Sequence, residues 1–126
     1  MSNHTHYSPT DTDAKVSVKP GKARQLNYFG QIAVDDAHHV ITGACSDFAN
    51  KRDSQCIEKI VELTKKNLNE NDIDLEELLA DGGYSSGEAL TYLHKKTLMP
   101  IFQISDNINL LEKDLFSTKN SINMNA

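Results

Sequence analysis

The chain of 126 residues is 38% hydrophobic and 6% aromatic with no Trp, which suits one domain with a modest, mostly aliphatic core. Its formal net charge of −5 excludes a protein that binds nucleic acid through an overall positive charge, so any cationic surface must be local. No apolar run has the length of a membrane span, and the first residues lack the regions of a signal peptide, so we expect a cytoplasmic protein without a membrane partner.

Residues 1–25 form a polar segment that contains Pro9, Pro20 and Gly21. Proline and glycine at such spacing interrupt regular secondary structure. We therefore predict an extended lead-in over residues 1–25 and a folded region that begins at residue 26.

Two β-rich runs, 28–34 and 40–45, come next and are separated by a short polar stretch. This arrangement is typical of a β-hairpin. Apolar residues at near-helical spacing then predict a helix over Ser54–Leu68, with Asp53 or Ser54 available as its N-cap.

A short apolar strand, Leu75–Ala80, runs directly into Asp81 and Gly82-Gly83, and a second helix is predicted over Ser86–Lys95. A carboxylate at the carboxyl end of a strand projects from a rigid element into the crevice where α/β sheets bind ligands and metals. Asp-Gly pairs are also common in turns and helix caps, and the local sequence alone favours that second interpretation. Asp81 is nevertheless the first candidate for chemistry.

Five blocks follow one another along the chain: His6–Ala14, Lys19–Lys22, Tyr28–Asp35, Lys51–Ser54 and Leu79–Ser85. Together they resemble successive segments of the DDE-domain transposases of bacterial insertion sequences, in particular the IS1182-like group of the IS4/IS5 type. Five blocks in the same order are far more specific than any one of them. The resemblance covers residues 2–96.

This resemblance implies a partial RNase H-like α/β domain over residues 26–96, built from a hairpin, a helix, a strand and a helix. It also implies catalysis by three carboxylates that hold two Mg²⁺ ions for DNA strand cleavage and transfer. Asp81 matches the second carboxylate of the family and is the expected catalytic and metal-binding residue. The family's first Asp, on an earlier central strand, and its Glu, after the second helix, are not evident.

We therefore expect a truncated domain that lacks its first central strand and leaves the neighbouring strand edges unpaired. Such a chain would bind Mg²⁺ weakly and would be inactive alone. Asp53 matches a recurrent position of the family, and we interpret it as a helix N-cap.

Four basic residues without acidic neighbours lie in the lead-in: Lys15, Lys19, Lys22 and Arg24. In the context of the family they could contact a DNA backbone, because phosphate neutralisation needs only placed cations. A solvated, flexible segment explains them equally well.

Residues 97–126 show no apolar period, and we predict an irregular or disordered tail. The codons of Ile101–Leu110 and Lys113–Asn120 can also be read one nucleotide earlier as strings that resemble the continuation of the family. A run of adenines at Lys95-Lys96 is a natural place for a nucleotide to be gained or lost. This pattern favours an out-of-frame tail over ordinary divergence.

Three functions remain open at this point. The chain is a fragment of a DDE transposase, a non-catalytic remnant that binds DNA or the full-length transposase, or a small α/β interaction domain unrelated to transposition.

Overall fold

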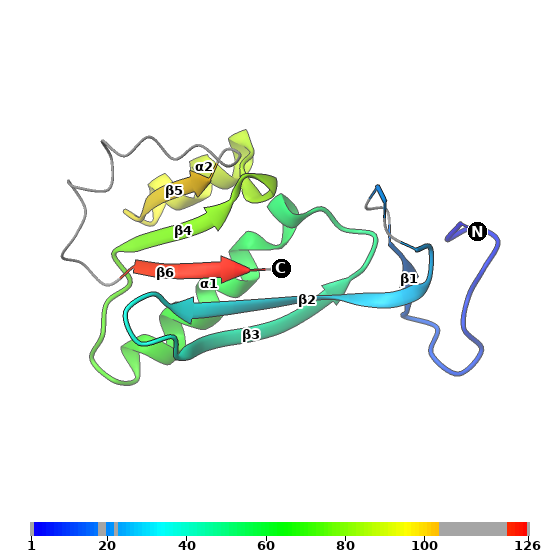
Figure 1. Ribbon diagram of the computed structural model, residues 1–126, viewed down its shortest axis with the longest axis horizontal. Helices are drawn as coiled ribbons and strands as arrows, with labels where there is room; N and C mark the ends of the chain where they lie inside the picture. The colour runs from blue at the N-terminus through cyan, green and yellow to red at the C-terminus, as the bar shows by residue number, and fades with distance from the viewer. Residues whose placement is uncertain (1, 18–19, 22, 104–120, 126) are drawn as a thin grey trace.

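The computed structural model describes residues 2–17, 20–21, 23–103 and 121–125. Six strands, two α-helices and one 3₁₀ turn (η1) are formed by these residues (Figure 1). In chain order the elements are β1 (Lys15–Val16), β2 (Leu26–Asp35), β3 (Ile41–Phe48), α1 (Asp53–Asn69), β4 (Glu77–Asp81), η1 (Gly82–Tyr84), α2 (Gly87–Lys95), β5 (Met99–Gln103) and β6 (Ser121–Asn125).

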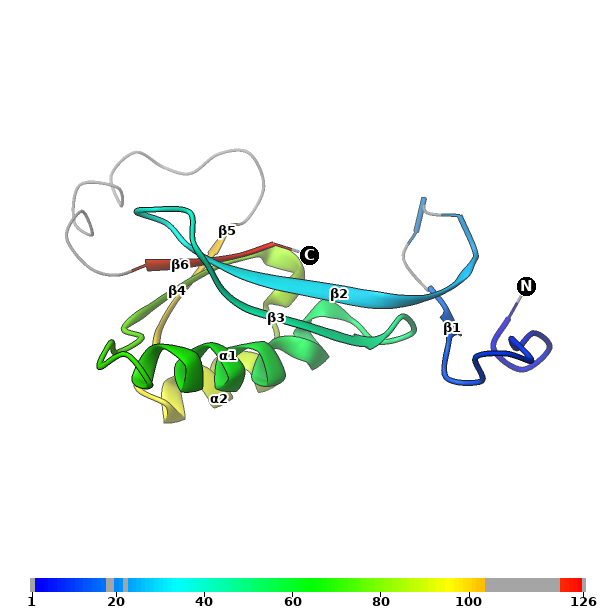
Figure 2. The same cartoon turned by 90° about the horizontal axis from the view of Figure 1, so that it is seen from below.

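A mixed sheet with the strand order β3-β2-β6-β4-β5 forms the centre of the fold, and β1 adds a short antiparallel pair at the start of β2. β2 is antiparallel to both β3 and β6, whereas β6, β4 and β5 run parallel to one another. Both helices lie on the same face of this sheet (Figure 2). The fold is therefore a two-layer α/β arrangement.

The predicted hairpin is confirmed as β2 and β3, which pair from Tyr28 opposite Phe48 to Val34 opposite Ile41. Its turn is closed by Asp35, whose carboxylate accepts a hydrogen bond from the backbone N–H of His38 at 2.8 Å. Alternation along β2 places Phe29, Gln31 and Ala33 in the interior and leaves the residues between them exposed.

Helix α1 confirms the predicted amphipathic pattern, because Cys56, Ile57, Ile60 and Val61 are all buried. It begins one residue earlier than predicted. Arg52 is the N-cap, so the interpretation of Asp53 or Ser54 as the cap is wrong. The side chain of Gln55 instead accepts the backbone N–H of Arg52 at 2.9 Å, which satisfies one amide at the helix entrance.

The core lies between the sheet and the two helices. Its largest fully buried side chains include Tyr84, Ile60, Leu78 and Leu93, and therefore come from every part of the chain between β3 and β5. Helices α1 and α2 are also joined by polar contacts, since the Tyr92 hydroxyl donates to Glu62 Oε1 at 2.7 Å.

The expectation of an irregular tail is wrong for the described part of residues 97–126. Met99–Gln103 form β5, which pairs with β4 along all of its length, and Ser121–Asn125 form β6. The expectation of an empty central position is also wrong, because β6 lies between β2 and β4 and pairs with both. The strands that pair with β5 and β6 are not their neighbours in sequence, so hydrophobic periodicity alone gave no signal for these pairings.

Candidate functional site

Asp81 is the last residue of β4, and its side chain is exposed. Its Oδ1 accepts the backbone N–H of Gly83 at 2.9 Å and thereby caps η1. The capping interpretation of the sequence is therefore confirmed. Asp81 nevertheless also lies at the carboxyl end of a strand near the sheet centre, which is where α/β folds bind ligands.

A second carboxylate, that of Asp53, approaches the same turn from the first residue of α1. A Cβ atom at Gly83 would lie 2.9 Å from Asp53 Oδ2 and 3.8 Å from Asp81 Oδ1. Because glycine carries no side chain, Gly83 lets both carboxylates lie against one point of the backbone. This position of Asp53 beside Gly83 was not expected, and the match of Asp53 to a recurrent family position was the signal that pointed to it.

Tyr84 and Cys56 lie behind these carboxylates in the protein interior, and both are fully buried. Burial raises the pKa of Tyr84 to about 12, and the negative charges of Asp53 and Asp81 add to this rise. Burial likewise raises the pKa of the Cys56 thiol to about 11. At neutral pH both groups keep their protons, so neither acts there as an anionic nucleophile.

Two carboxylates beside one turn offer hard oxygen ligands of the type that Mg²⁺ prefers. A two-metal site needs further ligands that bridge the ions. In the part of the chain that the structure describes, no group of three or more His, Cys, Asp or Glu side chains is arranged to hold a metal ion. The donor set of Asp53 and Asp81 thus fits one weakly held divalent cation better than a metal pair.

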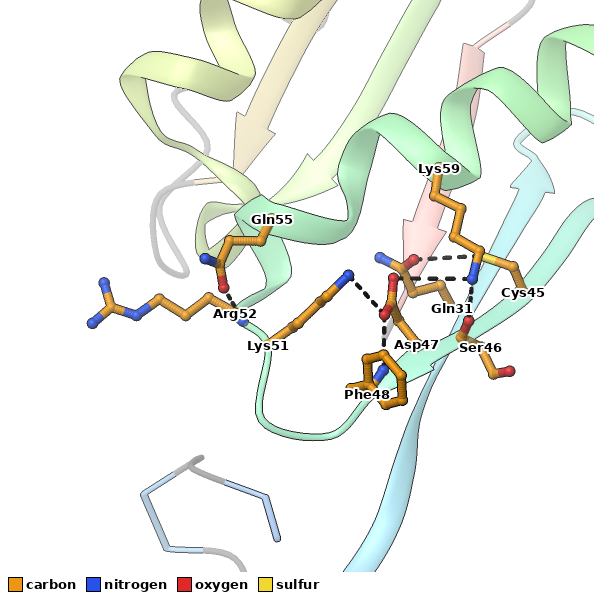
Figure 3. Close-up of polar contacts among 9 residues, drawn as sticks. All are labelled: Gln31, Cys45, Ser46, Asp47, Phe48, Lys51, Arg52, Gln55 and Lys59. Atoms are coloured by element: carbon orange, nitrogen blue, oxygen red, sulfur yellow. Dashed lines mark hydrogen bonds and ion pairs between the residues drawn. The ribbon is translucent and has the colours of Figure 1, made fainter. Parts of the chain in front are cut away.

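A separate charged cluster joins the end of β3, the loop that follows it and helix α1 (Figure 3). The Asp47 carboxylate binds Lys51 at 2.9 Å and lies 3.9 Å from Lys59. Partial burial opposes ionisation of Asp47, but the hydrogen bond from Lys51 and the two positive charges outweigh it, and the pKa of Asp47 falls below its ordinary value. The charged cluster connects β3 with α1, and we therefore interpret it as a contact that holds the strand and the helix together.

The four basic residues of the lead-in are only partly placed. Lys19 and Lys22 lie outside the described residues. The Lys15 ammonium donates to the backbone oxygen of Thr12 at 3.1 Å, and Arg24 is exposed just before β2. β1 lies beyond the end of the sheet, away from both helices (Figure 1). The structure therefore does not bring Lys15 into contact with Asp81.

A family model described as a transposase DDE domain matches residues 4–125. The chain belongs to the transposase DDE domain family. The match confirms the resemblance at the level of the family and extends past Thr97, where the resemblance was expected to end. No curated protein matches the chain, and no solved structure matches it.

Domains of this family act in DNA transposition, bind DNA and generally use divalent metal ions. None of the helices in the described ranges combines the length and apolar character needed to cross a membrane.

Proposed function

We propose that the chain carries part of an RNase H-like DDE domain of the IS1182-like type, with Asp81 as its metal-binding catalytic carboxylate, acting in the cytoplasm. The placement of Asp81 at the carboxyl end of β4, one strand from the sheet centre, supports this assignment more than any other observation. The strand order supports it too, because the expected RNase H-like sheet has a central strand between the hairpin and the strand that ends in the second carboxylate.

Asp53 is the second carboxylate of this proposed site. It would share with Asp81 the task of holding Mg²⁺ beside Gly83. When bound, the ion would polarise a phosphate and stabilise the oxygen that leaves during strand cleavage. The residues of the chain supply the binding charge, and the η1 turn fixes Asp81 through the amide of Gly83.

Among the described residues, the two carboxylates do not supply the ligand charge of a metal pair. We therefore expect that the chain alone neither cleaves nor joins DNA. It acts as a fragment, or as a non-catalytic remnant that binds DNA or the full-length transposase. Lys15, Lys19, Lys22 and Arg24 would contribute the contacts to the DNA backbone.

A cleavage assay tests the lack of activity. The purified chain is incubated with Mg²⁺ and duplex DNA from the flanks of its own gene, and nicked and joined strands are separated on a denaturing gel. We expect no product above the level of an Asp81→Ala control. Specific nicking that disappears in Asp81→Ala would show that the chain supplies a complete catalytic site.

DNA binding is tested separately, by the salt dependence of the affinity for the same duplex. Loss of the charges in Lys15→Ala/Arg24→Ala should weaken binding and flatten its dependence on salt. Unchanged binding in that variant would remove the lead-in from the proposed interface.

A further inference from the structure

Two buried polar side chains, Tyr84 and Gln31, lie on the interior side of the proposed cation site. Tyr84 of η1 is 0% exposed, and Gln31 of β2 is 2% exposed. Within the described ranges, neither the Tyr84 hydroxyl nor Gln31 Nε2 has a hydrogen-bond partner. Because buried donors are nearly always hydrogen-bonded in folded proteins, these two atoms indicate a state of the site in which an acceptor reaches them.

The contact with β3 sets the direction of the Gln31 amide. Its Oε1 accepts a hydrogen bond from Cys45 Sγ at 3.5 Å, and its nitrogen points away from Cys45 (Figure 3). Burial raises the pKa of Tyr84, and the Gln31 amide opposes this rise, which is the effect of a donor that approaches the phenol oxygen. Gln31 therefore acts as a donor toward Tyr84, and the Tyr84 hydroxyl must donate its own proton elsewhere.

Asp53 is the acceptor best placed for that proton. Its Oδ2 faces Gly83, whereas its Oδ1 is buried in the interior. Burial is the main cause of the raised pKa of Tyr84, and of the two carboxylates Asp53 adds more to it than Asp81. Asp81 is exposed, and its Oδ1 already accepts the amide of Gly83. The sequence of donors from Gln31 through Tyr84 therefore leads to the buried side of Asp53.

We infer that Tyr84, supported by Gln31, is a positioning residue whose hydroxyl donates to Asp53 Oδ1 when a divalent cation is bound. The inference rests on the proposed function, because it concerns the same two carboxylates. Carboxylates that bind metals are in turn hydrogen-bonded, and these outer donors fix the orientation of the ligand. A donor on Oδ1 leaves Oδ2 directed toward the cation beside Gly83.

The test measures the affinity for Mn²⁺ from the broadening of the Gly83 amide signal, together with the urea midpoint in the absence of metal. Tyr84→Phe removes only the hydroxyl, and we expect it to weaken Mn²⁺ binding by about 10–100-fold. The urea midpoint should not fall, because the variant loses a buried donor that has no partner without the cation. Tyr92→Phe is the matched control, since it removes a tyrosine hydroxyl that donates to Glu62 instead, and it should bind Mn²⁺ like wild type.

Two further measurements cover the case in which Tyr84→Phe does not fold. Gln31→Met removes the amide that supports Tyr84 and should weaken Mn²⁺ binding in the same direction. In the wild-type chain labelled with ¹³C at tyrosine Cζ, Mg²⁺ should shift the signal of Tyr84 and leave that of Tyr92 in place.

The inference is overturned if Tyr84→Phe binds Mn²⁺ like wild type, or if it loses stability without losing affinity. A Tyr84 signal that Mg²⁺ does not shift would also overturn it. These results would leave the proposed cation site intact as long as wild type shows broadening at Gly83. Absence of that broadening in wild type would contradict the cation site itself, and the positioning role with it.

Discussion

At the residue scale, the proposed site consists of two aspartates that are far apart in sequence and both approach Gly83. Asp81 could be predicted from its place after an apolar strand, because that signal is local. The approach of Asp53 could not, because it depends on how α1 lies over η1. The charged cluster could not be predicted for the same reason, because Lys59 reaches Asp47 from the middle of α1.

The charged cluster leads to a prediction for Asp47. Its pKa in the folded protein lies below the value of about 3.9 for an unperturbed Asp. The cluster therefore stabilises the fold above that pH and loses this contribution as the pH falls through the folded pKa. We expect Asp47→Asn to lower the urea midpoint at pH 7 and to differ less from wild type at pH 3.

Asp74→Asn, at an exposed carboxylate, is the control for removal of one negative charge. An Asp47→Asn variant as stable as this control at pH 7 would show that the cluster contributes nothing to stability.

At the element scale, the contact between β3 and α1 depends on Gly43. A Cβ atom at this buried position would lie 2.5 Å from Thr64 Oγ1 and 3.6 Å from Thr64 Cα. The side chain and the helix behind it must move to accommodate a methyl group. We expect Gly43→Ala to lower the free energy of unfolding by about 1–3 kcal/mol, as overpacked cores do.

Gly30 on the neighbouring strand is the matched control, because a Cβ atom there has no neighbour within 4 Å. Chemical denaturation should find Gly30→Ala close to wild type. Equal stabilities for the two alanine variants would contradict the close packing of α1 on β3.

At the scale of the whole molecule, the sequence predicted the order of elements from β2 to α2, because each has a periodic apolar pattern or a turn signal of its own. It did not predict β6. The residues Ser121–Asn125 alternate polar and apolar over only five positions, which is too short a pattern to identify a strand without its partners. Their place between β2 and β4 is set by pairing across the molecule.

The proposed shift of reading frame is also a prediction about the whole chain. The DNA around Lys95-Lys96 should contain a run of adenines, and the alternative frame should stay open opposite the tail and continue with sequence typical of the family. Sequencing of the gene and its flanks checks this. A stop codon in the alternative frame opposite Ile101–Lys113 would contradict it.

The central claim is that Asp53 and Asp81 together hold a divalent cation beside Gly83, and a titration with Mn²⁺ tests it most directly. Bound Mn²⁺ broadens the NMR signals of nearby amides. We predict the strongest broadening at Gly83 and Tyr84, a large loss of this effect in Asp81→Asn, a smaller loss in Asp53→Asn, and none in Asp74→Asn. Broadening centred elsewhere, or unchanged at Gly83 in Asp81→Asn, would contradict the account.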